Sequence, residues 1–243
     1  MSGKAYSVLA TIYDRLTDKD LYIKWKDRSL KVLASYPFLR TGADVACGSG
    51  FFTVAQKKAG YNVTGVDVCP EMLVEAQKNA IKEGVNVNFL CRDMTELKLF
   101  GKVDYITVIN DGLNYIPNEK LPKTFKNFYN NLNDGGILYF DFSTEYRLKN
   151  LLGNNVFAED YDDLTFLWFN EFSGDSIKMN MTLFIKNGDK YDRSDEDHVQ
   201  FVHTLDFLKK ELAAAGFKKV IACEFFGGDI KDTSERIEII AEK

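Results

Sequence analysis

The sequence has no long apolar run, no excess of positive charge and no paired cysteines. None of its apolar runs reaches the ~18 residues needed to span a bilayer, and residues 1–6 lack the apolar core of a signal peptide. We therefore expect a cytoplasmic protein. The 243 residues carry a formal net charge of −5, which gives no electrostatic footprint for duplex nucleic acid and argues against such a partner.

The cysteines are too few and too scattered to build a site of their own. The chain contains Cys47, Cys69, Cys91 and Cys223, with no Cys-x-x-Cys pair among them. This spacing argues against a zinc site or a redox dithiol. We predict reduced thiols and no metal site.

Apolar periodicity predicts a helical start followed by strands that alternate with helices. The expected helices cover residues 5–16, 21–36, 51–58, 71–83, 119–132 and 204–215. The expected strands cover residues 43–47, 62–68, 87–91, 103–110, 137–142, 218–224 and 236–242. Such alternation is typical of an α/β fold with a doubly wound, mostly parallel seven-stranded sheet. The short linker at residues 227–229 predicts that the last two strands form an antiparallel hairpin.

Residues 153–202 break this alternation. After a short helix over residues 145–151, strands are expected at 164–172, 177–186 and 198–202, separated by Ser173-Gly174-Asp175 and Asn187-Gly188-Asp189. Turns of this chemistry connect antiparallel strands. We therefore expect an α/β domain formed by residues 1–152 and 203–243, with an inserted antiparallel β meander at 153–202, here called the lid.

The segment Ala43-Asp44-Val45-Ala46-Cys47-Gly48-Ser49-Gly50, followed by Asp67, carries the clearest chemistry. It reads as a strand, a glycine turn, a helix and a second strand that ends in an acid. Glycines allow the backbone to approach a ligand where a side chain would block it. An acid at the end of the second strand lies where a ribose would bind in an open α/β sheet. The pattern predicts a nucleoside-binding site.

The turn departs from the two common phosphate-binding patterns. Thr53 stands where a dinucleotide-binding G-x-G-x-x-G has its third glycine, and no Gly-Lys-Ser/Thr of a P-loop follows the turn. A site that keeps the ribose acid without phosphate-binding features suits a linkage that carries no phosphate, as in S-adenosylmethionine (SAM). An NAD-dependent oxidoreductase and a non-catalytic SAM-binding protein remain the alternatives.

Taken together, the motifs resemble those of class I SAM-dependent methyltransferases over nearly the whole chain. The small bacterial type is the most similar, in particular amino-sugar N,N-dimethyltransferases and glycine N-methyltransferase. The resemblance rests on Asp44–Gly50, Val66-Asp67-Val68, Cys91-Arg92-Asp93-Met94, Val108–Tyr115, Ile12–Leu16 with Trp25, and the closing segments 215–217 and 235–240.

The resemblance implies a SAM cofactor and a set of binding residues. The glycine turn would take the methionine tail, Asp67 the ribose hydroxyls, and Asp93 with the Met94 amide the adenine, while the Tyr13 and Trp25 segment would fold over the cofactor. The implied cofactor-binding residues are Tyr13, Trp25, Ala46, Gly48, Gly50, Asp67, Val68, Asp93, Met94, Asn110 and Asp111.

The expected reaction is in-line transfer of a methyl group to a small-molecule nucleophile, with nitrogen favoured. A neutral amine needs little help from a base, and we assign no catalytic residue. If the acceptor must lose a proton, the candidates are Asp111, Tyr115, Glu145 and His203, and we interpret His203 as structural. We expect a monomer or homodimer.

The lid is expected to determine the acceptor and not the cofactor. Its aromatic side chains could line the acceptor pocket or pack between the lid and the α/β domain. These residues are Phe166, Trp168, Phe169, Phe172 and Phe184.

Overall fold

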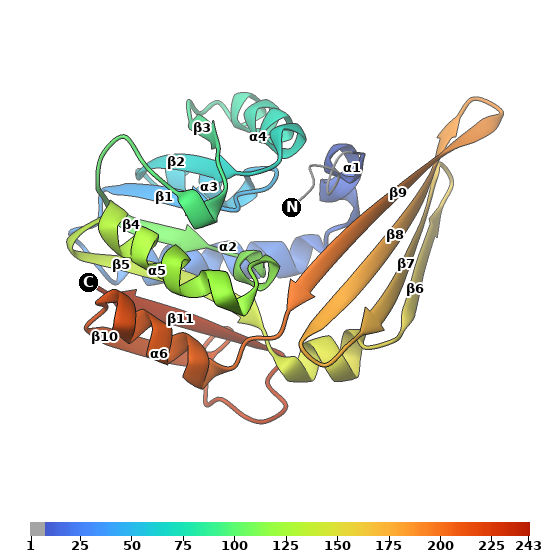
Figure 1. The fold of residues 1–243 in the computed structure, drawn as a ribbon. Helices are drawn as coiled ribbons and strands as arrows, with labels where there is room; N and C mark the ends of the chain where they lie inside the picture. The colour runs from blue at the N-terminus through green and yellow to red at the C-terminus, as the bar shows by residue number, and fades with distance from the viewer. Residues whose placement is uncertain (1–7) are drawn as a thin grey trace.

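The computed structural model describes residues 8–243 and contains the predicted seven-stranded sheet (Figure 1). Its strands are β1 (Thr41–Val45), β2 (Asn62–Asp67), β3 (Asn88–Cys91), β4 (Val103–Val108), β5 (Leu132–Ser143), β10 (Lys219–Glu224) and β11 (Arg236–Glu242). Their order is β10-β11-β5-β4-β1-β2-β3. Only β11 runs antiparallel to its neighbours β5 and β10. The predicted fold class and the closing hairpin are confirmed.

Helices cover both faces of this sheet. On one face lie α2 (Lys19–Ala34), α3 (Phe51–Lys58) and α4 (Pro70–Lys82), and on the other lie α5 (Leu121–Asn131) and α6 (Leu205–Ala215). The largest apolar cluster packs α5 and α6 onto β4, β5 and β11. No helix among the described residues is both long and apolar enough to cross a membrane.

Short helical segments complete the α/β part of the chain. They are the 3₁₀ helices η1 (Met94–Glu96), η2 (Gly112–Tyr115) and η3 (Asn118–Lys120), and the π-helix η4 (Arg147–Leu152). The first helix, α1, spans Leu9–Leu16. The predicted start of this helix, residues 5–7, lies outside the described residues.

The lid forms a second, antiparallel sheet in the order β6-β7-β8-β9. Its strands are β6 (Val156–Tyr161), β7 (Leu164–Phe172), β8 (Ser176–Asn187) and β9 (Lys190–Phe201). The sequence analysis missed β6 and began β9 eight residues late, at His198. All six residues of β6 are exposed, as are most in the first half of β9. These stretches therefore bury no apolar face, and their strand conformation comes from hydrogen bonding to β7 and β8.

Strand β5 also begins earlier than predicted. The Asn133-Asp134-Gly135-Gly136 segment has turn chemistry, yet β5 starts at Leu132, which pairs with Val103 of β4. The register shifts between Val103 and Tyr105. The expected turn is thus an irregularity inside the strand, where extra residues on one strand are absorbed without ending the pairing.

Helix α1 lies between the lid and α4 (Figure 1). Its residues Leu9 and Ile12 are buried in a cluster with Leu164, Phe166 and Leu183 of the lid. Its opposite side places Ala10 against Cys69 and Met72 at the start of α4. One short helix therefore joins the lid to the α/β sheet.

Candidate functional site

A cavity of about 190 Å³ opens at the carboxyl ends of the parallel strands. Strand β1 pairs with both β2 and β4, so the strand order reverses at β1. Ligands bind outside the sheet at such a reversal point. Most of the predicted cofactor-binding residues line the cavity, namely Tyr13, Ala46, Gly48, Asp67, Val68, Asp93, Met94 and Asn110. The lining does not include Trp25, Gly50 or Asp111.

The two glycines of the turn have different tasks. Gly48 has a φ of +53°, and a Cβ added to it would meet no atom within 4 Å. Gly50 has a φ of +79°, but its added Cβ would lie 2.9 Å from Cβ of Ala76 in α4. Gly48, which lines the cavity, therefore has open space beside it. Gly50 instead allows α4 to pack against the turn, which corrects the expectation that both glycines admit a ligand.

Thr53, which replaces the third glycine of the dinucleotide pattern, is hydrogen-bonded to the strand that precedes the turn. Its hydroxyl donates to the carboxylate of Asp44, which also accepts a hydrogen bond of 2.7 Å from Thr107. All three side chains are buried. Burial raises the pKa of Asp44 to about 6. The position is therefore occupied by a polar group that ties α3 to β1 and β4.

Asp67 lies at the end of β2 and faces the glycine turn. One carboxylate oxygen accepts from the Gly48 amide at 2.8 Å and the other from the Cys69 amide at 2.9 Å. The side chain is largely buried, and this burial raises its pKa, while the backbone donors partly offset the effect. Each carboxylate oxygen has a further lone pair that a ligand donor can use.

Asp93 begins the short helix η1 beyond β3. Its Oδ1 accepts from the Thr95 amide at 2.8 Å, which is an N-cap interaction. Met94 follows directly and also lines the cavity. The cap fixes the backbone of this loop beside Asp67 and Val68.

Strained backbone gathers at the rim of the cavity. Among the described residues, only Ala46, Asn110, Asp111 and Phe226 have positive φ without being glycine. Ala46 and Asn110 line the cavity, and Asp111 follows Asn110 directly. Such conformations persist when the surroundings enforce them, and they concentrate at functional sites.

Buried charges enforce the turn after β4. Asp141 accepts hydrogen bonds from the amides of Asn110, at 2.8 Å, and Asp111, at 3.4 Å. The guanidinium of Arg236, on β11, pairs with both Asp141 and Asp111. The Asp111 carboxylate also accepts from the Ser143 hydroxyl. Asp111 is therefore committed to shaping the turn and does not face the cavity.

The shaped turn directs the Asn110 side chain toward two tyrosines. Its amide nitrogen donates to the hydroxyls of Tyr22, at 2.8 Å, and Tyr13, at 3.1 Å, and these hydroxyls lie 2.9 Å apart. Burial raises the pKa of both tyrosines. Both hydroxyls therefore stay protonated at neutral pH. Tyr22 was not predicted, although it shares the N-terminal helical segment with Trp25.

Trp25 is buried behind the cavity wall and not in it. Its ring lies 4.6 Å from the Arg236 guanidinium carbon and packs against Tyr22, Phe52 and Phe225. It supports Tyr22 and Arg236 from behind. The structure thus places this residue one layer away from the position that the resemblance implied.

The other candidate bases are also engaged or lie elsewhere. His203 is buried, with Nδ1 at 2.7 Å from Asn118 Oδ1 and Nε2 at 3.0 Å from the Leu113 carbonyl oxygen, so it joins η2 to η3. Glu145 is exposed and does not line the cavity. Tyr115 lines the cavity, and its hydroxyl lies 3.5 Å from Nδ1 of His198 on the lid.

Glu196 and His198 are functional candidates that the sequence analysis missed. Both side chains are completely buried on the inner side of β9, with 3.5 Å between His198 Nε2 and Glu196 Oε2. Together with Gln200 they form a buried polar row at every second residue. That alternation was the available signal, but the predicted strand began at His198 and so left out Glu196.

None of the lid aromatics lines the cavity. Phe166 is buried against α1, whereas Phe169 is 43% exposed. For Phe166, the packing interpretation is the correct one.

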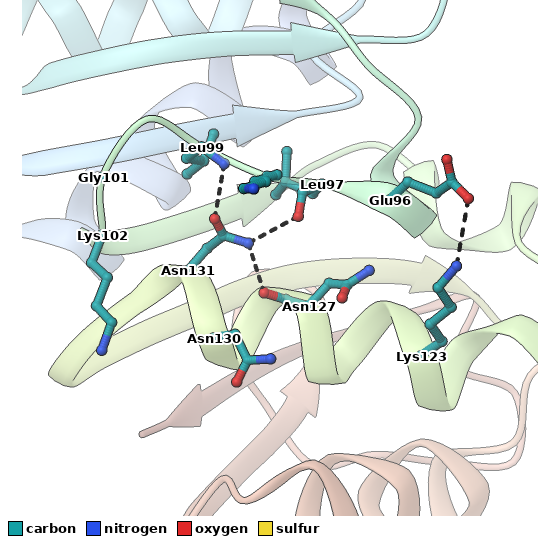
Figure 2. Close-up of a pocket in the computed structure, with 10 residues that line it drawn as sticks. Glu96, Leu97, Leu99, Gly101, Lys102, Lys123, Asn127, Asn130 and Asn131 are labelled. Atoms are coloured by element: carbon teal, nitrogen blue, oxygen red, sulfur yellow. Dashed lines mark hydrogen bonds and ion pairs between the residues drawn. The ribbon is translucent and has the colours of Figure 1, made fainter.

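Two larger hollows lie away from the strand ends. The hollow in Figure 2, about 530 Å³, is bounded by α5 and the loop before β4. Its polar groups bond to one another: the Asn131 side chain accepts from the Leu99 amide and donates to the carbonyl oxygens of Leu97 and Asn127. Another, of about 710 Å³, lies between α2, α3 and α4. Size alone does not identify the site, because neither hollow has the strand-end geometry described above.

Comparison with known proteins agrees with the geometry. Residues 43–136 match the family model described as "Methyltransferase domain". A protein of Geobacillus sp. (strain WCH70), described as a candidate methyltransferase, is 33% identical over 247 residues, covering 98% of this chain and 99% of the relative. A crystal structure of a SAM-dependent methyltransferase from Clostridium acetobutylicum ATCC 824 matches with a TM-score of 0.87 and 30% identity over 98% of each chain.

The fold extends to more distant proteins. The sugar N-methyltransferase KedS8 from Streptoalloteichus sp. ATCC 53650 matches with a TM-score of 0.78 and 16% identity, covering 100% of this chain and 94% of that one. At this identity the match supports the fold alone. No comparison supports the NAD-dependent alternative. The strand order, the strand-end cavity and the full-length relatives lead to one conclusion: the chain belongs to the class I SAM-dependent methyltransferases.

Proposed function

We propose that the chain holds SAM in the strand-end cavity and transfers its methyl group to a nitrogen atom of a small molecule. The observation that carries the proposal is the convergence of Gly48, Asp67 and Asp93 on one cavity. When bound, SAM supplies a methyl group on a positively charged sulfur. The open space beside Gly48 and the lone pairs of Asp67 suit such a nucleoside, whose ribose is joined to its tail without phosphate.

The proposed roles of the lining residues follow their positions. Ala46 and Gly48 would accommodate the methionine tail, and Asp67, with Val68 beside it, would accept from the ribose hydroxyls. Asp93 and the Met94 amide would hold the adenine. These assignments use only cavity-lining residues, so Trp25, Gly50 and Asp111 are not included.

The hydroxyls of Tyr13 and Tyr22, with the Asn110 side chain, give the cavity a polar region next to the turn after β4. We assign these three side chains to aligning the reactants. Alignment behind the transferred methyl group and exclusion of water account for most of what such a displacement needs from an enzyme.

Nitrogen is favoured because the candidate bases have other partners. Both Asp111 oxygens accept from Arg236, and both ring nitrogens of His203 face acceptor oxygens. A hydroxyl acceptor would have to lose its proton to a base. An amine attacks through a neutral lone pair and can release its proton to solvent afterwards. A neutral amine therefore requires least from these residues.

The first test is ligand binding. S-adenosylhomocysteine (SAH) and SAM should raise the melting temperature, and NAD should not. A ligand at a hundredfold excess over its dissociation constant stabilises the native state by about 2.7 kcal/mol. Equal shifts with NAD, or no shift with either sulfur nucleoside, would refute the proposed site.

The second test concerns the acceptor atom. Pairs of small molecules that differ only in an amine or a hydroxyl group are incubated with methyl-labelled SAM, and the products are analysed by mass spectrometry. We expect label on the amine members, with rates that rise as pH approaches the pKa of each amine. Methylation of hydroxyl members at comparable rates would contradict the nitrogen assignment.

A further inference from the structure

Helix α1 has an N-terminus that its own sequence cannot cap. The N-cap position is Val8, whose apolar side chain makes no capping hydrogen bond. The helix spans only eight residues, Leu9–Leu16, and helices this short are not stable by themselves in water. Its position must therefore come from tertiary contacts.

The cap comes from the lid. Oε1 of Glu196 accepts hydrogen bonds from the amides of Val8 and Leu9, both at 2.9 Å. These residues are separated by more than 180 positions in the sequence. A carboxylate at a helix N-terminus satisfies free amides and interacts favourably with the helix dipole. The buried Glu196 is thus well placed to fix the start of α1.

The other end of α1 reaches the cavity. Tyr13 lines the cavity and joins the hydroxyl cluster with Tyr22. Asp14 accepts from the Ser49 hydroxyl of the glycine turn at 2.6 Å and from the Asn79 side chain at 3.0 Å. The position of α1 therefore determines where two parts of the cavity wall lie.

We propose that Glu196 is a positioning residue for cofactor binding, which it supports by capping α1 and so holding Tyr13 at the cavity and Asp14 on the glycine turn. This inference rests on the proposed cofactor site. Glu196 does not line the cavity, so its contribution to binding is indirect and runs through α1. When α1 leaves its place in a fraction of molecules, the apparent affinity for SAM falls by that fraction.

The experiment compares Glu196→Ala and Glu196→Gln with Asp197→Ala. Asp197 is the next residue on β9, but it is exposed, and its carboxylate accepts a hydrogen bond from the Asn180 side chain on β8, which makes it a matched control. SAH affinity is measured by calorimetry. Tryptic cleavage after Arg15 reports whether α1 is in place.

We expect Glu196→Ala to weaken SAH binding three- to tenfold and to speed cleavage after Arg15, with Asp197→Ala unchanged in both. Glu196→Gln keeps an acceptor oxygen and should lie near the wild type. Because binding and helix placement are linked reciprocally, saturating SAH should restore slow cleavage in Glu196→Ala.

Circular dichroism first establishes that each variant is folded. If Glu196→Ala is not folded, Glu196→Asp takes its place, because its shorter side chain should reach the α1 amides less well and so weaken SAH binding. A folded Glu196→Ala, or a folded Glu196→Asp in its place, with wild-type affinity and wild-type cleavage would overturn the inference. A wild-type protein that binds no SAH would instead overturn the proposed function itself.

Discussion

At the residue scale, the cavity depends on side chains that already make hydrogen bonds within the protein and can accept further ones. One carboxylate oxygen of Asp67 accepts from the Gly48 amide in the glycine turn, and the other accepts from the Cys69 amide at the start of α4. The side chain can therefore be in position before any ligand arrives. Such preorganisation reduces the cost of ordering the site on binding.

Replacement of this acid should affect binding more than folding. Asp67→Ala should weaken SAH binding more than tenfold, because each hydrogen bond to a charged group contributes roughly 1.5–3 kcal/mol. Calorimetry on the folded variant tests this. Glu71→Ala is the control, since Glu71 also lines the cavity but has no proposed cofactor role. Equal losses in the two variants would point to a general charge effect.

The buried Asp44 predicts a pH dependence of stability. Its pKa in the folded protein is about 6, above its ordinary value, because burial disfavours the charged form. The native state therefore binds more protons than the unfolded state between about pH 4 and pH 6. The contribution of this carboxyl to stability is greatest below that window and is lost as the pH rises through it.

Asp44→Asn should remove this dependence while keeping an oxygen for the threonine hydroxyls. The melting temperature of the variant minus that of the wild type should rise from pH 4 to pH 6 and stay constant above pH 6. The expected change in stability is at most roughly 3 kcal/mol, from 1.36 kcal/mol per pKa unit. A difference that is flat across this range would contradict the expectation. Burial also raises the pKa of Asp141. Because both proteins contain Asp141, its contribution cancels when the two melting temperatures are subtracted.

At the element scale, the helix that follows β2, α4, packs against the glycine turn that follows β1. Ala76 lies directly opposite Gly50. From the motif alone, Gly50 is assigned to close approach of a ligand. The sequence cannot distinguish a glycine that makes room for a ligand from one that makes room for a packed helix. Only the packed structure distinguishes them.

Gly50→Ala should destabilise the protein by at least about 1 kcal/mol more than Gly60→Ala. Both residues have positive φ, with the associated cost of about 1–2 kcal/mol for alanine, but an added Cβ at Gly60 meets nothing within 4 Å. Urea denaturation measures the difference. Ala76→Gly should recover part of the loss in the Gly50→Ala background, although it costs about 1 kcal/mol by helix propensity in the wild type. Purely additive effects would show that the contact does not matter.

At the scale of the whole molecule, the lid and the cofactor cavity are physically connected. The sequence analysis expected the lid to choose the acceptor and leave the cofactor site to the sheet. The structure does not support so clean a division, because α1 packs its apolar side on the lid and supplies Tyr13 to the cavity. Arg15 of α1 also pairs with Asp163 of the lid at 2.7 Å.

Replacing residues 153–202 with a Gly/Ser linker should therefore weaken SAH binding at least tenfold, besides removing methyl transfer. The reason is that α1 loses its cap and its apolar partner together. A variant in which only the β8–β9 turn, residues 187–190, is replaced should keep wild-type affinity. Calorimetry on folded samples measures both. Unchanged SAH affinity in the linker variant would restore the division that the sequence suggested.

The sequence by itself determined the fold class, the order of strands and helices in the α/β domain, and eight of the residues that line the cavity. Apolar periodicity and turn chemistry are local properties of the sequence. In a parallel sheet, the carboxyl ends of the strands then lie together at one edge. The placement of α3 and β11 agrees with prediction to the residue. Gly48, Asp67 and Asp93 could be predicted for the same reason, because each ends a strand or lies within three residues of a strand end.

Only the tertiary structure decided what long-range packing controls. In the folded protein, Trp25 lies behind the cavity wall and Asp111 pairs with Arg236. Gly50 packs against Ala76, and Glu196 lies at the start of α1. The tertiary structure also made strands of residues 156–161 and 190–197, which have little apolar alternation. For the single residues the deciding partner is a side chain or a helix that is distant in the chain, and for these two strands it is backbone hydrogen bonding to β7 and β8. Such partners leave no local pattern in the sequence.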